Sequence, residues 1–289
     1  MYLCIDIGGT YIKYGYYHND SWKEKGKIKT IKTNINEFYF SLLTLKRDNL
    51  KGIAISMPGL LDNQSGYIEA ITLLPFLEKR NIKNDLENLF NLPVSIENDA
   101  KCAAIGEMWK GNLQGINNAF FMVIGSGIGG TIILNGEIIN SLHHKTGEIG
   151  SILMPLDTHY YQMTNFGKNN NSNKMISDLS NIISCENDGL IVFEKLKNNK
   201  KALILFKQYC RQIAFMIYNL DYILDLDVVC IGGGISEQDL FINTIQNEFS
   251  KLREQYKEDE HEPYITNCMY HNEANLLGAL YHHLKTHQI

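Results

Sequence analysis

The stretch Asp6-Ile7-Gly8-Gly9-Thr10 decides how the rest of the chain is interpreted. An apolar segment (residues 2–5) precedes it, and a segment rich in strand-forming residues (11–17) follows it. Two strands joined by a Gly-Gly turn predict a hairpin. Glycines let backbone N–H groups approach phosphate oxygens, and the Asp6 carboxylate can hold Mg²⁺ directly or through water. On this stretch alone, an ordinary hairpin turn is an equally good interpretation.

Length and composition point to a soluble protein of about two domains. The 289 residues are 44% apolar, which is ample for a core, and the net charge of −5 argues against a nucleic-acid surface. No apolar run reaches the length of a membrane span, and strand pattern begins at once without a basic leader. The six cysteines are scattered without a CxxC pair, so we expect free thiols, no cysteine zinc site, and a cytoplasmic location.

Strands alternate with helices along the chain, which predicts the α/β class. Expected helices cover residues 35–45, 84–90, 100–108, 203–223, 239–252 and 274–284, and the last is expected to return to the first lobe. Expected strands cover residues 52–56, 93–97, 119–124, 132–134 and 227–231. The remaining segments are interpreted as a linker after the hairpin, a turn at 57–62, and a polar stretch at 151–173 with a mobile loop at 168–173.

Two further glycine clusters follow apolar strands. Gly125–Thr131 ends the most apolar strand and repeats the order of strand, glycine turn, hydroxyl and returning strand, while Gly232–Gly234 closes a later strand. A P-loop would need Gly-Lys-Ser/Thr, and a dinucleotide fingerprint would need a helix directly after the glycines. The repeated turn instead predicts two lobes that face one another across a nucleotide.

Three side chains are candidates for chemistry or its support. Asp99 stands at a strand-to-helix junction, where it serves equally well as a general base or as a helix N-cap. Glu148 is either an acceptor for a polyol or a solvated loop acid, and Lys13 either neutralises phosphate or is an exposed strand residue. His282, His283 and His287 are expected to face solvent.

Six motifs in order resemble the ROK family of sugar kinases and repressors: Asp6-Ile-Gly-Gly-Thr10, Ser56-Met-Pro-Gly59, Glu97-Asn98-Asp99-Ala100, Gly125-Ser-Gly-Ile-Gly-Gly130, Gly147-Glu148-Ile-Gly150 and Gly232-Gly-Gly-Ile235. The resemblance spans nearly the whole chain. It implies an α/β, two-lobed actin-like ATPase (ribonuclease H-like) fold with an interlobe cleft. The first lobe would be 1–117, completed by the helix in 274–289, and the second 118–273.

The resemblance also implies a role for each motif. Asp99 would be the general base for the sugar 6-hydroxyl, and Asp6 would organise Mg²⁺. The other hydroxyls of the sugar would be held by Asn98, Glu148, Asp99 and the backbone of Gly59. ATP would be bound by Gly8, Gly9, Thr10, Lys13, Gly125, Gly127, Gly129 and Gly130, with Gly232, Gly233 and Gly234 near the adenosine.

This chain departs from the family pattern after the Gly147–Gly150 turn. Ser151 stands where many members carry a histidine, and no cysteine lies between Cys102 and Cys185, so no structural zinc is expected. The chain therefore resembles the zinc-lacking kinases for N-acetylmannosamine and for β-glucosides. We expect an ATP-dependent 6-kinase of N-acetylmannosamine or a related hexose, with a β-glucoside kinase or glucokinase as the alternative.

A sugar-responsive repressor or a non-catalytic sugar sensor is the alternative from another class. Repressors of the family carry a helix-turn-helix before the first glycine motif, and only five residues precede Asp6. The resemblance further implies a homodimer, with no nucleic-acid or membrane partner. Neither the identity of the sugar nor a contact between the sugar and Ser151 or residues 151–173 follows from the sequence.

Overall fold

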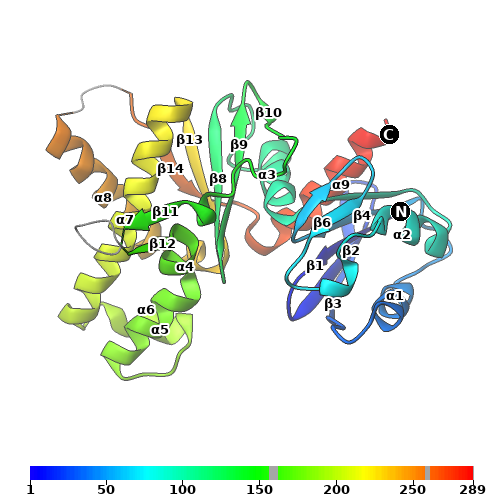
Figure 1. The fold of residues 1–289 in the computed structure, drawn as a ribbon, viewed down its shortest axis with the longest axis horizontal. Coiled ribbons are helices and arrows are strands. Elements are labelled where there is room, and N and C mark those ends of the chain that lie inside the picture. The colour runs from blue at the N-terminus through cyan, green and yellow to red at the C-terminus, as the bar shows by residue number, and fades with distance from the viewer. Residues whose placement is uncertain (156–161, 258–260, 289) are drawn as a thin grey trace. The chain divides into compact units, whose positions relative to one another are not determined.

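The computed structural model describes residues 1–155, 162–257 and 261–288. The chain divides into two compact units (Figure 1). Unit 1 comprises Met1–Gln114, Asn140–Lys145 and Asn272–Ile289, and unit 2 comprises Gly115–Ile139 and Thr146–His271.

The centre of unit 1 is a five-stranded sheet in the order β3-β2-β1-β4-β7. Its strands are β1 (Tyr2–Ile7), β2 (Tyr11–His18), β3 (Ser21–Lys29), β4 (Gly52–Met57) and β7 (Val94–Asn98). The first three strands pair antiparallel, whereas β4 and β7 run parallel to β1. A small antiparallel pair, β5 (Leu60–Asp62) and β6 (Tyr67–Ala70), follows β4.

Both faces of this sheet are buried, and the alternation along β1 shows how. Leu3, Ile5 and Ile7 pack in one apolar cluster with side chains of α1 (Ile35–Leu43) and α2 (Ile82–Phe90). Cys4 points to the other face and packs with side chains of α3 (Asp99–Lys110) and α9 (Ala274–Thr286). This opposite pointing of successive residues is the period of two that a strand imposes.

The helices α3 and α9 lie side by side, and glycines bring their backbones into contact. A Cβ added to Gly278 would lie 1.6 Å from the carbonyl oxygen of Cys102, and one on Gly106 would lie 2.4 Å from that of Ala274. A larger residue at either position would therefore force the two helices apart. α9 also packs against β1, β4 and β7.

The sheet of unit 2 repeats the arrangement of unit 1, with the order β10-β9-β8-β13-β14. Its strands are β8 (Ala119–Ile124), β9 (Ile128–Leu134), β10 (Glu137–Ile138), β13 (Val228–Gly232) and β14 (Tyr264–Asn267). In this sheet β9 pairs antiparallel with both β8 and β10, whereas β13 and β14 run parallel to β8. Each sheet therefore has the strand order and directions of the ribonuclease H-like fold, as predicted.

Helices and a small hairpin complete unit 2. The helices are α4 (Phe166–Asn170), α5 (Ser172–Ile183), α6 (Gly189–Leu196), α7 (Lys200–Leu224) and α8 (Asp239–Tyr256). The hairpin pairs β11 (Leu153–Pro155) with β12 (Met163–Asn165). Phe206, Ile213 and Ile217 of α7 are fully buried in the single large apolar cluster of this unit.

Short 3-10 turns complete the described elements. They are Pro75–Leu77, Ile149–Ser151, Gly234–Glu237 and His271–Glu273.

Several local predictions were wrong. The expected linker after the hairpin contains β3, an edge strand whose exposed lysines hid its pattern. The expected turn at 57–62 includes β5. The expected mobile loop at 168–173 is the end of α4 and the start of α5, because Asn171 caps α5 by accepting from the Lys174 N–H. Residues 156–161 of the expected irregular stretch lie outside the described residues.

Two predictions about single residues also need correction. Asn98, not Asp99, is the N-cap of α3, because the Asn98 side chain accepts from the N–H groups of Ala100 and Lys101. His283 does not face solvent but is fully buried, since α9 turns this face toward the sheet.

Two further expectations from the sequence concern the cysteines and membrane-spanning helices. All six cysteines are free, and every one except the half-buried Cys185 is buried. Within residues 1–155, 162–257 and 261–288, no helix combines the length and apolarity needed to cross a membrane.

Candidate functional site

The register of the parallel strands explains why three motifs of unit 1 meet. Asp6 of β1 pairs with Ser56 of β4, and Ser56 pairs with Glu97 of β7. These residues therefore form one row across the sheet, close to the carboxyl ends of three parallel strands. Loops begin with Gly8 after β1 and with Pro58 after β4, whereas Asp99 begins the helix α3 directly after β7. Ligands of open α/β sheets bind characteristically outside these strand ends.

The Asp6–Thr10 turn is held in place by a residue from the end of β3. The N–H of Gly8 donates to the carbonyl oxygen of Tyr11 at 3.1 Å. Thr30 donates twice, from its N–H to the Thr10 carbonyl at 3.1 Å and from its hydroxyl to the Gly8 carbonyl at 2.7 Å. Thr30 is only 5% exposed, so this support is a permanent part of the turn.

Asp6 is a buried carboxylate with polar partners from three elements. Its Oδ1 accepts from the Ser56 hydroxyl at 2.9 Å and from the Asn275 side-chain amide of α9 at 3.1 Å. Lys13 is its cross-strand partner on β2. Burial raises the pKa of Asp6, and the Ser56 hydrogen bond, the Lys13 charge and the Asn275 hydrogen bond oppose that rise. A buried carboxylate of this kind is suited to stand beside a cation.

Asn98 and Asp99 occupy the junction between β7 and α3. The Asn98 Oδ1 caps the helix, and its Nδ2 donates to the Gly59 carbonyl at 3.2 Å. Asp99 is the first helical residue, half-buried, and its Oδ1 accepts from the Ala100 N–H at 2.9 Å. The start of a helix favours a negative charge, which suits a carboxylate at this position.

Glu97 supports this junction from below. Only 3% of Glu97 is exposed. Its Oε1 accepts from the Asn98 N–H at 2.7 Å, and its Oε2 accepts from the Asn63 side chain. Each carboxylate oxygen therefore has a partner, which a buried charge requires.

Gly59 needs to be glycine at the start of β5. Its φ is +116°, a region that side chains disfavour, and an added Cβ would lie 2.8 Å from the carbonyl oxygen of Ala70. Its carbonyl is the acceptor for Asn98, so the conformation of Gly59 and the orientation of Asn98 depend on one another.

In unit 2, the glycine turn after β8 is tied to the start of α5. The Gly125 N–H donates to the Gly127 carbonyl at 2.9 Å. The Gly125 carbonyl accepts from Ser172 twice, from the backbone N–H at 2.9 Å and from the hydroxyl at 2.7 Å. A Cβ added to Gly125 or Gly127 would meet no described heavy atom within 4 Å. The turn is thus fixed on one side and open on the other.

The remaining predicted residues of unit 2 lie on three segments. Gly129 and Gly130 belong to β9, which begins at Ile128 rather than at the predicted residue 132. Glu148 is half-buried and precedes the 3-10 turn Ile149–Ser151, whose Ser151 is exposed and donates its N–H to the Glu148 carbonyl at 3.0 Å.

Gly232, Gly233 and Gly234 follow one another from the end of β13 into a 3-10 turn. Gly233 has φ +94°, and a Cβ there would lie 2.2 Å from the Ile124 carbonyl oxygen at the end of β8. The turn that follows β13 therefore packs directly against the end of β8, the strand that leads to Gly125.

The predicted site residues fall in both units. Unit 1 contains Asp6, Gly8, Gly9, Thr10, Lys13, Gly59, Asn98 and Asp99, and unit 2 contains Gly125, Gly127, Gly129, Gly130, Glu148, Gly232, Gly233 and Gly234. Sequence reasoning assigned no role to Ser56, Asn275, Thr30 or Ser172, although Ser56 stands in a quoted motif. Their partners lie tens to hundreds of residues away, so no local pattern signals them.

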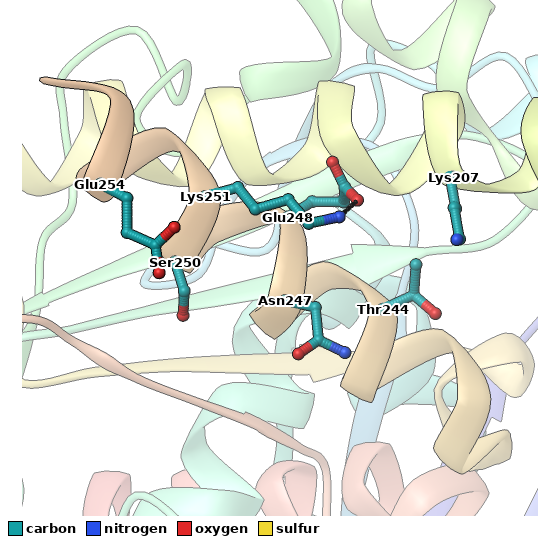
Figure 2. A pocket seen from close by; sticks show the side chains of 7 residues that line it. All are labelled: Lys207, Thr244, Asn247, Glu248, Ser250, Lys251 and Glu254. Carbon is teal, nitrogen blue, oxygen red and sulfur yellow. Dashed lines mark hydrogen bonds and ion pairs between the residues drawn. The ribbon is translucent and has the colours of Figure 1, made fainter.

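A pocket between α7 and α8 lies apart from the predicted residues (Figure 2). Two of its charged lining residues form an ion pair, in which Lys251 Nζ lies 2.5 Å from Glu248 Oε1. Glu248 Oε2 also lies 3.3 Å from Nη1 of Arg211, which does not line the pocket. We assign this pocket no function.

Comparison with known proteins agrees with the resemblance found in the sequence. The model of the ROK family matches residues 2–285. A β-glucoside kinase of Klebsiella pneumoniae is 28% identical over 96% of this chain and 94% of its own length. A ROK family protein from Streptococcus pneumoniae, solved in complex with sucrose, is 28% identical, with a TM-score of 0.87 over 99% of both chains. A Listeria monocytogenes protein described as a candidate N-acetylmannosamine kinase is 25% identical, with a TM-score of 0.85 over 99% of both chains.

Proposed function

Because the chain belongs to the ROK family, we propose that it is an ATP-dependent carbohydrate kinase that phosphorylates the 6-hydroxyl of a hexose or hexose derivative. The coarser part, a ROK family sugar kinase, rests on the family match and on full-length relatives. The position of the hydroxyl and the identity of the sugar are our inference.

The observation that carries the proposal is the placement of two different carboxylates at one edge of the unit 1 sheet. Asp6 ends β1, is buried and accepts two neutral hydrogen bonds, whereas Asp99 starts α3 and is half-buried. Two carboxylates in such different environments suit two roles, one beside a metal and one as a base.

In the proposed reaction, Asp99 accepts the proton of the sugar 6-hydroxyl. The bond from that oxygen to the γ-phosphorus forms, the bond from the γ-phosphorus to the bridging oxygen breaks, and ADP leaves. Because phosphoryl transfer passes through a loose transition state, a weakly basic carboxylate is sufficient.

Asp6 would hold Mg²⁺, directly or through water. Its buried carboxylate, with a pKa raised by burial, gains stabilisation from an adjacent cation, and its oxygens are the hard donors that Mg²⁺ prefers. The ion supplies charge neutralisation on the phosphates. The chain supplies the orientation of Asp6 through Ser56 and Asn275.

The glycine turns would bind the nucleotide through their backbones. In this proposal Gly8, Gly9, Thr10 and Lys13 of unit 1, and Gly125, Gly127, Gly129 and Gly130 of unit 2, contact the phosphates, with Gly232–Gly234 near the adenosine. The open side of the Gly125–Gly127 turn supports this role, because a phosphate needs room to approach the backbone closely.

Asn98, Glu148 and the backbone of Gly59 would bind the other sugar hydroxyls. Asn98 carries two N–H groups, and one of them donates to Gly59. Its second N–H is the group that suits a sugar oxygen. Polar partners that a sugar hydroxyl would satisfy reject ligands that lack this hydroxyl.

Three sugar candidates compete. The departure at Ser151 and the lack of cysteines between Cys102 and Cys185 fit the zinc-lacking kinases of both N-acetylmannosamine and β-glucosides. The relatives named β-glucoside kinase favour a β-glucoside. The sucrose complex favours a glycoside in general, since the glucose unit of sucrose carries a substituent on its anomeric carbon. Glucose is the third candidate.

A coupled ADP-release assay tests the proposal on N-acetylmannosamine, glucose, mannose, N-acetylglucosamine and cellobiose. We expect release with one class, and expect Asp99→Asn to lower kcat by about 10²–10⁴-fold while the sugar still binds. Asp20→Asn, in an exposed turn, is the matched control. Full turnover by Asp99→Asn would overturn the assignment of the base, and sugar binding without ADP release would favour the sensor.

A further inference from the structure

We infer that Asn275, the second residue of α9, is a positioning residue that orients Asp6 for the Mg²⁺–nucleotide complex. This inference rests on the proposed function, because it gives Asn275 a role in the same site. It adds a residue from the far end of the chain to a site that is otherwise read from motifs near its beginning.

The contacts of Asn275 form a closed triangle. Its Nδ2 donates to Asp6 Oδ1 at 3.1 Å and to Ser56 Oγ at 3.3 Å, and Ser56 Oγ donates to the same Asp6 oxygen at 2.9 Å. Two donors on one oxygen fix the rotation of the carboxylate about its Cβ–Cγ bond. One donor alone would leave that rotation less restricted.

The amide group suits this task chemically. An amide nitrogen donates hydrogen bonds without adding charge, so it supports the carboxylate but does not compete with a cation for it. By contrast, the side chain of Lys13, which is paired with Asp6 across to β2, carries a positive charge. Asn275 is half-buried, so water does not readily replace it.

The backbone of α9 is fixed where Asn275 needs it. Close contacts at Gly278 and Gly106 clamp α9 against α3, and α3 begins at Asp99. One helix pair therefore sets the position of Asn275 at one end of α9 and of the proposed base at the start of α3. A shift of α9 would move the partner of Asp6 relative to Asp99.

The second hydrogen-bond donor to Asp6 comes from the C-terminal helix and not from a residue near Asp6 in sequence, and this has a physical reason. The neighbours of Asp6 on β1 are apolar, and its parallel partner on β4 is Ser56, which brings one hydroxyl. The second donor must come from the layer that covers this face of the sheet, and α9 is packed there.

The test compares Asn275→Ala with Asn275→Asp, which keeps the shape but replaces both N–H donors with an acceptor. ADP is the probe, and its binding is measured by calorimetry with Mg²⁺ and again with EDTA. We expect Asn275→Ala to weaken binding in the presence of Mg²⁺ by roughly tenfold, as for a hydrogen bond to a charged group, and Asn275→Asp to weaken it further. Binding in EDTA should change by less than about twofold in Asn275→Ala.

Two controls make the result specific. Lys285→Ala, at the exposed end of the same helix, should leave both affinities unchanged. The double variant Ser56→Ala/Asn275→Ala should lose less than the sum of the single losses, because both donors act on one oxygen. Melting curves confirm that each variant folds, and Ala is well tolerated in the first turn of a helix.

The outcomes separate the inference from the proposed function. Wild-type protein that binds no ADP with Mg²⁺ would contradict the proposed function itself. If the wild-type protein binds ADP with Mg²⁺ and Asn275→Ala binds it equally well, only the inference about Asn275 is overturned. An equal loss with Mg²⁺ and with EDTA would also overturn it, because the effect would then not pass through the metal-dependent contact.

Discussion

Ser172 and Gly125 are joined by two hydrogen bonds to a single carbonyl oxygen, at 2.9 Å from the Ser172 N–H and 2.7 Å from its hydroxyl. The start of α5 thus holds the glycine turn that follows β8, across 47 positions of sequence. Because the backbone bond survives any substitution except proline, the hydroxyl can be removed alone.

We predict that Ser172→Ala raises the KM for ATP by about fivefold, the equivalent of about 1 kcal/mol for one neutral hydrogen bond, with a smaller effect on kcat. Steady-state kinetics with varied ATP provides the measurement. Ser172→Thr keeps the hydroxyl and should restore the KM, while Asn173→Ala, at the exposed next position, should not change it. An unchanged KM in Ser172→Ala would remove the turn from the nucleotide site.

Gly59→Ala should destabilise the protein by about 2–4 kcal/mol, because it combines a strained φ with a close approach to a carbonyl oxygen. Urea unfolding measures the change. Gly115→Ala is the matched control, since Gly115 has φ +74° but nothing within 4 Å of an added Cβ, and it should cost only about 1 kcal/mol. Equal losses at the two positions would show that strain alone, without the contact to Ala70, accounts for the effect.

Acid should destabilise unit 1 through His283. Burial lowers the pKa of His283 to about 3, and the neighbouring charges of His287, His282 and Lys83 act in the same direction. The ring lies within hydrogen-bonding distance of Ser95 and packs against His287 and Tyr2. Above its ordinary pKa of 6.5 the group is neutral in both states, so the loss begins only as the pH falls below that value.

Between pH 6.5 and about 3 the unfolded chain binds a proton that the folded protein excludes. Stability should therefore fall by up to about 1.4 kcal/mol per pH unit from this residue. His283→Gln should show a shallower slope in urea unfolding at pH 7, 6, 5 and 4, whereas His18→Gln, at an exposed strand end, should retain the wild-type slope. Identical slopes in all three proteins would rule out His283 as the source.

Metal analysis should find no stoichiometric zinc in the purified protein. Removal of metals with EDTA should leave the melting temperature unchanged and abolish turnover, and Mg²⁺ should restore the turnover. The physical reason is that no cysteine lies between Cys102 and Cys185, so the segment for which the family resemblance implies a zinc site has no thiolate to offer. A melting temperature that EDTA lowers would contradict the prediction.

The sequence predicted best where the signal was local. Apolar strands that end in glycines identified β1 and β8. The repeated pattern predicted two lobes, and the shared strand order of the two sheets is a finding of the structure. The predictions were least accurate where one residue type is common in two kinds of local structure. The asparagines at 169–171 are typical of loops, yet Asn171 caps α5, and the lysines of β3 are typical of linkers, yet they stand on an edge strand.

The sequence could point to only some residues of the proposed site, for a related reason. Asp6, Asn98 and Asp99 are visible because each stands at a strand end beside a turn. The sequence does not reveal Thr30, Ser172 and Asn275, because each of them acts through a hydrogen-bond partner that is remote in sequence. Only folding brings the donor to its acceptor.

The triangle of Asp6, Ser56 and Asn275 has a consequence for biosynthesis. Asn275 follows Asp6 by 269 positions. At about 5–20 residues per second, a ribosome needs roughly 15–50 s to make the intervening chain. Throughout that time the β1–β2 hairpin and the glycine turn within it exist without the helix α9, which packs against β1. The nascent chain must therefore keep the first strands soluble until the final helix emerges, and the first motif to be translated is among the last to be completed.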